Sequence, residues 1–281
     1  MIIKDVEGLQ RIRIGVYDSG IGGLTVLKQL LMKIPFGIDF FYFADTARLP
    51  YGSKPQEMVR GFISEILSFF RHINVDAIVT ACNTTDSLLT EAEKNNLWVP
   101  FFSIIDPTIH YLRNNVSDKN SIAIIGTEVT IKRSVYLRKL IIDENISGIF
   151  QKACPLFVPL VEEGLSDGEL TEWIVTYYLE EIRRISPNYL ILGCTHYSYL
   201  KTVIEKYLGN GTQIIDPADH VSEKVIEWIG KIETTKKSSV TFYVTGSAED
   251  FKRKASLLLE SSDELVVSHV ELKKLGEFIH L

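Results

Sequence analysis

Residues 78–84 have the sequence Ile-Val-Thr-Ala-Cys-Asn-Thr, and residues 190–196 have the sequence Leu-Ile-Leu-Gly-Cys-Thr-His. In both stretches a short apolar run, typical of a buried parallel strand, leads directly to a cysteine and then to polar residues. The chain has 281 residues and three cysteines, so two of the three, Cys82 and Cys194, follow the same kind of strand. The pattern favours a site at which two thiols face one small molecule from opposite sides.

Short β-branched runs alternate with longer amphipathic runs along the rest of the chain. This alternation predicts an α/β fold in which helices cover parallel sheets. The predicted strands are 12–17, 39–44, 77–81, 122–125, 189–192 and 240–244, and the predicted helices are 23–33, 54–73, 85–95, 130–142, 167–185, 220–229 and 248–259.

The two halves of the chain resemble each other. Strand 12–17 ends in Asp18-Ser19-Gly20, strand 122–125 ends in Gly126-Thr127-Glu128, and a cysteine follows each at a similar separation. We therefore expect two similar parallel-sheet α/β domains that face each other across a central active-site cleft. The first comprises residues 1–103 plus 216–281, with the Asp18 loop and Cys82, and the second comprises residues 104–215, with Cys194. Asp-Pro steps at 106–107 and 216–217 mark the boundaries, because they discourage a continuous helix.

Composition excludes several classes of protein. Hydrophobic residues make up 46% and charged residues 23%, as in ordinary globular proteins, and the formal net charge is −6. The one dense basic pair, Lys236-Lys237, is too short for a nucleic-acid face. No apolar run reaches the ~18–20 residues of a membrane span, and the charged N-terminus lacks the apolar segment of a signal peptide. We expect a cytoplasmic protein with reduced thiols and with neither nucleic-acid nor membrane partners.

Two polar loops follow the first two predicted strands. Residues 18–23, Asp-Ser-Gly-Ile-Gly-Gly, open a helix, so their glycines allow close backbone approach and the free amides attract an anion. The loop lacks the Gly-Lys-Ser/Thr of a Walker motif, and by itself it is equally a tight turn. Residues 45–54 form a long polar connection, and the simplest interpretation is a solvated loop with Tyr51 on its rim.

The residues around the two cysteines can support chemistry. A thiol at a helix N-terminus feels the positive end of the helix dipole, which can lower its pKa into the range ~3.5–7.5. Asn83, Thr84 and Thr195 can donate hydrogen bonds to a carboxylate. His196, which follows Cys194 closely, can tune that thiol or relay a proton.

Other uses of the cysteines fit less well. Neither Cys82 nor Cys194 belongs to the Cys-x-x-Cys pairs usual in zinc sites, so we expect no metal. A cysteine hydrolase needs one thiol and gives no role to a second. Cys154, in Lys-Ala-Cys-Pro-Leu-Phe, is expected to be a small buried core residue.

Four segments, DSGIGGL (18–24), ADTARLPYGSK (44–54), ACNTT (81–85) and LGCTHY (192–197), resemble in this order the glutamate racemase family of the aspartate/glutamate racemase superfamily. The resemblance runs from about residue 12 to the final strand and helix. It implies two α/β domains facing each other across the active site and a reaction that uses neither pyridoxal phosphate nor metal. No cofactor is therefore expected.

The resemblance also implies roles for individual residues. Cys82 would take the α-proton from the D-enantiomer and Cys194 from the L-enantiomer, with the sulfurs roughly 6–7 Å apart across the substrate. Asp18 and His196 would be auxiliary acid/base groups. Residues matching the family's substrate-binding positions are Asp18, Ser19, Tyr51, Gly52, Asn83, Thr84, Thr195 and His196, and Glu162 matches an acidic residue near the site.

The function implied is the interconversion of L- and D-glutamate, a small-molecule substrate, to supply D-glutamate for peptidoglycan. A homodimer is expected because such enzymes are often dimers. Two alternatives stay open: a racemase of aspartate or another acidic amino acid, and a racemase-like binding protein with little turnover. The chain departs from the family pattern with Ala44 in place of glycine, Thr85-Asp86 in place of alanine and a small residue, and Ser198 in place of proline.

Overall fold

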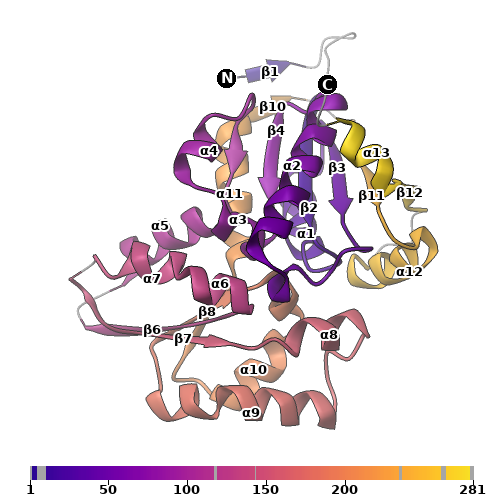
Figure 1. The fold of residues 1–281 in the computed structure, drawn as a ribbon. Helices are drawn as coiled ribbons and strands as arrows, with labels where there is room; N and C mark the ends of the chain where they lie inside the picture. Colours follow the sequence, from indigo (N-terminus) through magenta and orange to yellow (C-terminus); the bar gives the residue numbers. More distant parts are fainter. Residues whose placement is uncertain are drawn as a thin grey trace.

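The computed structural model describes residues 2–4, 11–116, 119–142, 144–233, 236–260 and 264–278. Two sheets with helices packed on their faces lie one above the other (Figure 1). Residues 1, 5–10, 234–235, 261–263 and 279–281 of the expected first domain, and 117–118 and 143 of the expected second, lie outside the described residues. Part of the N-terminal stretch that was compared with a signal peptide therefore also lies outside the described residues.

The upper sheet in Figure 1 has six parallel strands in the order β12-β11-β3-β2-β4-β5. The lower sheet has four parallel strands in the order β7-β6-β8-β9. A separate parallel pair joins β1 (Ile2–Lys4) to β10 (Lys231–Glu233). The strands of the two larger sheets are β2 (Ile12–Asp18), β3 (Ile38–Ala44), β4 (Ala77–Thr80), β5 (Phe101–Phe102), β6 (Asn120–Gly126), β7 (Ile146–Ala153), β8 (Tyr189–Gly193), β9 (Gln213–Ile215), β11 (Ser239–Val244) and β12 (Val266–His269).

The two sheets share one strand order. In chain order the first four strands of the upper sheet are arranged as β3-β2-β4-β5, and the four of the lower sheet are arranged in the same way as β7-β6-β8-β9. Cys82 follows β4 and Cys194 follows β8, so the two cysteines leave corresponding strands. The prediction of two similar parallel α/β units is confirmed.

Amphipathic helices cover both sheets. In α2, for example, Val59, Ile63, Ile66 and Phe70 recur at helical spacing and are buried, which fixes the face of the helix that packs inward. The helices are α1 (Leu24–Lys33), α2 (Gln56–His72), α3 (Asn83–Leu88), α4 (Glu91–Asn95), α5 (Ile105–Asn115), α6 (Glu128–Arg133), α7 (Val135–Leu140), α8 (Phe157–Glu162), α9 (Glu169–Ile185), α10 (Lys201–Leu208), α11 (Pro217–Ile229), α12 (Ala248–Leu258) and α13 (Leu272–Phe278), with 3₁₀ turns η1 (Tyr51–Ser53) and η2 (Thr195–Leu200).

Two predicted helices are each divided in the structure. The prediction of a single helix over 85–95 is wrong. Helix α3 ends at Leu88, and a second helix, α4, begins after its N-cap residue, Thr90. Thr90 and Glu93 form a capping box, in which the Thr90 hydroxyl accepts from the Glu93 N–H (3.2 Å) and the Glu93 carboxylate accepts from the Thr90 N–H (2.7 Å). The helix expected over 130–142 breaks at Ser134, whose φ of 49° is left-handed and ends α6.

Both Asp-Pro steps initiate helices. Pro107 lies in the first turn of α5, and Pro217 is the first residue of α11, positions at which the missing N–H costs nothing. Asp216 caps α11 by accepting a hydrogen bond from the Ala218 N–H (3.0 Å). The crossings between the two sheets at 103–107 and 215–217 therefore lead directly into α5 and α11, which pack against each other.

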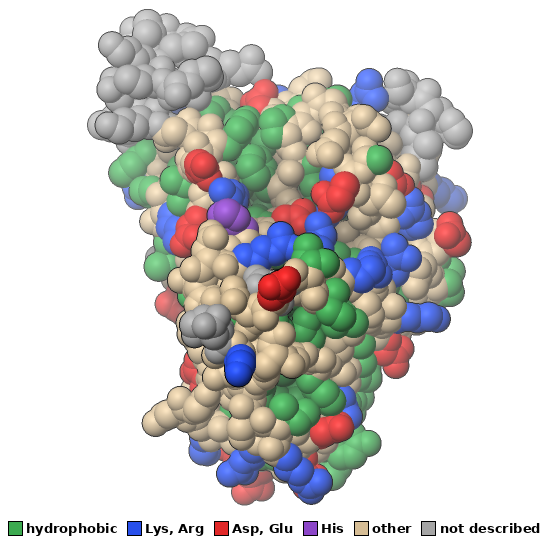
Figure 2. Space-filling view, turned by 90° about the vertical axis from the view of Figure 1, so that its left-hand side faces the viewer, with side chains coloured by type: hydrophobic (Ala, Val, Ile, Leu, Met, Phe, Trp, Pro, Cys, Tyr) green, Lys and Arg blue, Asp and Glu red, His purple; other side chains and the backbone are tan. Residues whose placement is uncertain are grey.

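In the described part of the chain, no helix is long and apolar enough to cross a membrane. Figure 2 views the molecule from the side of α4, α5 and α7. Basic and acidic side chains are interspersed among the coloured residues of this face, and neither sign dominates it.

Candidate active site

The two cysteines lie where β4 and β8 end and polar turns begin. Cys82 directly precedes α3, and Cys194 directly precedes η2. Both are almost fully buried, with 5% and 7% of their surface exposed. All three cysteines of the chain are free thiols, so no disulfide joins Cys82 to Cys194. Cys154 is fully buried in the core, as expected.

Cys82 holds its proton tightly. Burial raises the pKa of its thiol, and the negative charges of Asp18 and Cys194 raise it further, whereas hydrogen bonds with Thr85 oppose the rise. The lowering expected from a helix N-terminus is wrong for Cys82, because desolvation outweighs the dipole of a helix as short as α3. At neutral pH Cys82 is therefore a protonated thiol.

Asp18 links the first loop to the second cysteine loop. One of its oxygens, Oδ1, accepts from the Gly20 N–H (2.8 Å), and Oδ2 accepts from the Thr195 hydroxyl (3.2 Å). Burial raises the pKa of Asp18, although the charge of His196 and the bond from Gly20 act against the rise. Ser19, next in the chain, is buried as well. The loop after β2 thus reaches across to the loop after β8.

Glu162 and His196 form a buried ion pair beside Cys194. The His196 Nε2 atom lies 2.8 Å from Glu162 Oε1, and Nδ1 lies 3.9 Å from the Cys194 sulfur. Burial alone would lower the pKa of His196, but the hydrogen bonds with Cys194 and Glu162 hold it well above its usual value. Burial alone would raise the pKa of Glu162, but His196 holds it below its usual value. Both shifts favour an imidazolium–carboxylate pair.

The glycines of the Asp18 loop allow this close approach. A Cβ on Gly20 would collide with the Glu162 carboxylate, and a Cβ on Gly22 would collide with the His196 ring and lie 2.8 Å from the Thr195 hydroxyl oxygen. The Ile21 N–H also donates to Glu162 Oε1 (3.3 Å). The loop can therefore contact Glu162 and His196 only if these positions lack side chains.

Replacing Gly22 with alanine is expected to displace His196 and Thr195. We expect a loss of about 1–3 kcal/mol in the free energy of unfolding, together with a fall in kcat/KM of roughly tenfold or more. Denaturant unfolding and a turnover assay would measure the two effects. Gly61→Ala in α2 is the matched control, because a Cβ there meets open space and a helical alanine stabilises by up to ~1 kcal/mol. Equal behaviour of the two variants would contradict the close-approach explanation.

The loop after β3 is only partly solvated: Asp45, Tyr51 and Gly52 are buried, whereas Ala47 and Ser53 are exposed. Tyr51 is 1% exposed, and its hydroxyl donates to Asp45, which also accepts from Arg48 Nε (2.7 Å). Burial raises the pKa of Tyr51 well above its usual value. Gly52 lies against Thr127, too close to leave room for a Cβ. This loop therefore contacts the turn after β6 in the other sheet.

Asn83 and Thr84 bridge toward the second sheet. Asn83 Oδ1 accepts from the Tyr136 hydroxyl (2.6 Å), whereas its buried Nδ2 has no hydrogen-bond partner among the described residues. The Thr84 hydroxyl lies 2.9 Å from that of Thr127. A buried amide N–H₂ without a partner is costly, and it is a ready donor for a carboxylate.

The structure adds residues that sequence reasoning missed. Thr127 contacts both Thr84 and Gly52, and it occupies the position in the second half that corresponds to Ser19 in the first. The internal repeat was the signal that could have identified it. Lys254, from α12, lies 3.8 Å from Glu162 Oε2. Nothing in its local sequence points to the site.

No group of three or more His, Cys, Asp or Glu side chains arranged to hold a metal ion occurs within the described residues. The groups gathered here are two thiols, a buried carboxylate, an imidazolium–carboxylate pair and an unpartnered amide. Such an arrangement can move protons and bind carboxylates.

Comparison with known proteins agrees with this chemistry. The model of the Asp/Glu/Hydantoin racemase family matches residues 37–224. This chain belongs to that family. The glutamate racemase of Thermoanaerobacter pseudethanolicus is 36% identical over 265 residues, which cover 93% of this chain and 98% of that protein. The resemblance to glutamate racemases and the enzyme class, an amino-acid racemase, are confirmed.

Solved structures of this racemase family have the same fold. Glutamate racemase from Thermus thermophilus, in complex with β-chloro-D-alanine, has a TM-score of 0.81 at 37% identity, covering 94% of this chain and 98% of that one. Glutamate racemase from Francisella tularensis subsp. tularensis, in complex with D-glutamate, has a TM-score of 0.84 at 29% identity, covering 95% and 100%.

Proposed function

We propose that this racemase interconverts L- and D-glutamate without a cofactor, using Cys82 and Cys194 as its two bases. The observation that carries the proposal is that two free, buried cysteines follow corresponding strands, β4 and β8, of two similarly ordered parallel sheets. Inversion at an α-carbon requires proton removal on one face and proton delivery on the other. Two thiols, one from each of two similar domains, satisfy this requirement.

In the L-to-D direction, the Cys194 thiolate removes the α-proton and Cys82 delivers its own proton to the opposite face. Cys194 then carries a proton and Cys82 is a thiolate, so the reverse reaction begins from the product state. A protonated Cys82 suits the first step. His196, within 3.9 Å of the Cys194 sulfur, and Asp18, whose charge acts on Cys82, are the auxiliary acid/base groups.

The remaining predicted residues hold the substrate. Asn83 Nδ2 is free to donate to a carboxylate, and the hydroxyls of Ser19, Thr84 and Thr195 lie in the same buried loops. Gly52 lies against Thr127, and Tyr51 belongs to the same buried cluster as Cys82. We assign the boundary between the domains to residues 103–104 and 215–216, where the chain crosses from one sheet to the other.

We place the enzyme in the cytoplasm, as a homodimer that supplies D-glutamate for peptidoglycan. This part of the proposal rests on the family resemblance. Molecular mass in solution and D-glutamate dependence of a strain that lacks the gene are its direct tests.

Exchange of the α-hydrogen in deuterium oxide tests the reaction itself. With L- or D-glutamate, the enzyme is expected to incorporate deuterium at Cα while the optical activity decays to zero, as measured by NMR and polarimetry. L- and D-aspartate serve as comparison substrates. Exchange with aspartate alone would move the assignment to an aspartate racemase, and no exchange with any of the four would leave only a binding protein.

A further inference from the structure

Asp86 departs from the family pattern by placing a charge where a small residue is usual. It lies in α3, all six residues of which are buried, and it is itself completely shielded from solvent. The backbone N–H of Asp86 donates to the carbonyl oxygen of Cys82 (3.0 Å). Asp86 therefore belongs to the first turn of the helix that follows the Cys82 thiol. A carboxylate buried at this depth requires compensating partners.

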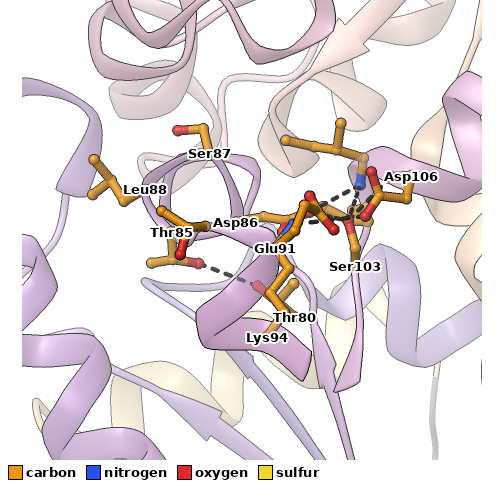
Figure 3. A network of polar contacts seen from close by, with 12 residues as sticks. Thr80, Thr85, Asp86, Ser87, Leu88, Glu91, Lys94, Ser103 and Asp106 are labelled. Atoms are coloured by element: carbon orange, nitrogen blue, oxygen red, sulfur yellow. Dashed lines mark hydrogen bonds and ion pairs between the residues drawn. The ribbon is translucent and has the colours of Figure 1, made fainter. Parts of the chain in front are cut away.

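Those partners come from outside α3. Asp86 Oδ1 lies 2.7 Å from the Lys94 ammonium of α4, and Oδ2 accepts from the Ser103 hydroxyl (2.6 Å) and the Ile105 N–H (3.0 Å) (Figure 3). The Lys94 side chain is only 6% exposed. Burial would lower the pKa of Lys94, but the charges of Asp86 and Asp106 raise it, so the ammonium stays charged.

The network continues into the second half of the molecule. Ser103 and Ile105 belong to the crossing at which the chain leaves the upper sheet and enters α5. Asp106, in the same crossing, contacts Lys139 of α7 (2.5 Å), and Lys139 also contacts Glu91 of α4 (2.9 Å). In the sequence, α7 lies between β6 and β7 of the lower sheet. This chain of contacts therefore connects α3, in the first half of the molecule, to the second half.

The neighbouring departure, Thr85, also holds the backbone of Cys82. Its hydroxyl donates to the Cys82 carbonyl oxygen (2.9 Å) and lies 3.1 Å from the hydroxyl of Thr80 (Figure 3). Thr85 and Asp86, the two departures from the family pattern, therefore restrain the same turn after Cys82. Thr85 does so next to Thr80 of β4, and Asp86 does so through the crossing at Ser103 and Ile105.

We propose that Asp86, paired with Lys94, is a positioning residue that fixes α3 to the crossing at Ser103–Asp106 and thereby keeps Cys82 in place opposite Cys194. This inference rests on the proposed racemisation and adds a residue to it. Asp86 acts through the backbone of α3 and does not touch the substrate. Misplacement of a reacting group by about 1 Å can lower a rate by ~10²-fold, so an anchor one helical turn from the thiol has a measurable effect.

The test is the double variant Asp86→Ser/Lys94→Met. It removes both buried charges together, which avoids an unpaired ion, and it gives position 86 the small residue usual in the family. We expect kcat/KM for glutamate to fall by about 10- to 100-fold. Because the two enantiomers are equal in free energy, kcat/KM must fall equally in both directions, so the rates alone do not reveal which thiol moved.

Primary kinetic isotope effects reveal which of the two thiols has moved. If Cys82 is displaced, proton transfer to and from Cys82 becomes the slowest step. The isotope effect on kcat/KM is then expected to rise with D-[2-²H]glutamate, from which Cys82 removes the deuteron, and to fall with L-[2-²H]glutamate. A merely structural loss would lower kcat/KM without moving the two isotope effects in opposite directions, and that result would overturn the proposal.

The control is Glu172→Ser/Lys206→Met, which makes the same exchanges at an exposed ion pair of 2.7 Å between α9 and α10 and is expected to behave as wild type. If the Asp86 double variant does not fold, Asp86→Asn/Lys94→Met replaces it, since asparagine beside a remaining Lys94 would leave that buried ammonium without its counter-charge. Asparagine keeps the shape and can still accept from Ser103, so a smaller shift of the same sign is expected, and no shift overturns the proposal. If the wild-type enzyme does not exchange the α-hydrogen of glutamate, the proposed function and this inference are both overturned. If the wild type is active and the Asp86 variants have unchanged isotope effects, this inference alone is overturned.

Discussion

Replacing either Cys82 or Cys194 with alanine is expected to lower the rate of glutamate racemisation by ~10⁴-fold or more, because in the proposed mechanism each thiol serves one face of the α-carbon. Both sulfurs are buried at the ends of corresponding strands. The loss would be measured as optical rotation from each enantiomer separately.

The third cysteine provides the matched control. Cys154 is buried and free like the other two, but it follows the edge strand β7 and not β4 or β8, so Cys154→Ala is expected to racemise glutamate within about twofold of wild type. Exchange without inversion, confined to L-glutamate in Cys82→Ala and to D-glutamate in Cys194→Ala, would be compatible with two bases. Inversion by either variant at a wild-type rate would contradict the mechanism.

Changing Glu162 to glutamine is expected to have the second largest effect, a fall of ~10²-fold in kcat/KM. Glu162 is the counter-charge of His196, and glutamine keeps the shape while removing the charge. The pKa of His196 should then fall, because one of the interactions that hold it high is lost. The adjacent Glu163 is exposed, and Glu163→Gln should leave activity unchanged. Equal activity of the two variants would exclude a role for the ion pair.

The same substitution should change stability with pH. Because the pKa of folded Glu162 is below its ordinary 4.5, its contribution is present above that pH and is lost as pH falls through the folded value. Because the pKa of folded His196 is above its ordinary 6.5, its contribution is present below that pH and is lost as pH rises through the folded value. The stability difference from Glu162→Gln, about 2 kcal/mol, should be largest between pH 4.5 and 6.5, as measured by denaturant unfolding.

The sheets could be predicted from local sequence because each central strand is a short apolar run that ends at a polar turn. The exceptions have physical reasons. Strand β7 lies at a sheet edge and is partly exposed, so Ile146–Ala153 lacks the apolar run of the central strands. The capping box of Thr90 and Glu93 has a local signature, Thr-x-x-Glu, which the prediction of one helix over 85–95 does not take into account. The break at Ser134 has no glycine or proline to mark it.

The residues of the candidate site could be named from the sequence, whereas their contacts could not. Motif resemblance named Asp18 and Glu162, but the bonds that they accept from Thr195 and Ile21 join residues more than a hundred positions apart. Such contacts depend on how one sheet sits over the other, which no local pattern encodes. The partners of Asp86 were hidden for the same reason, because Oδ2 accepts from a later crossing and Oδ1 forms an ion pair with another helix.

The shared strand order has a consequence for how such an enzyme can change. The frame that presents each sulfur is the same in both halves, but the neighbours differ: an imidazolium–carboxylate pair accompanies Cys194, whereas hydroxyls and the buried Asp86–Lys94 pair surround the helix of Cys82. In the proposed mechanism, mutation can therefore alter the proton transfer at one thiol while the surroundings of the other thiol stay unchanged. Because the two enantiomers are equal in free energy, such a change shifts which transfer limits the rate and leaves kcat/KM equal in the two directions.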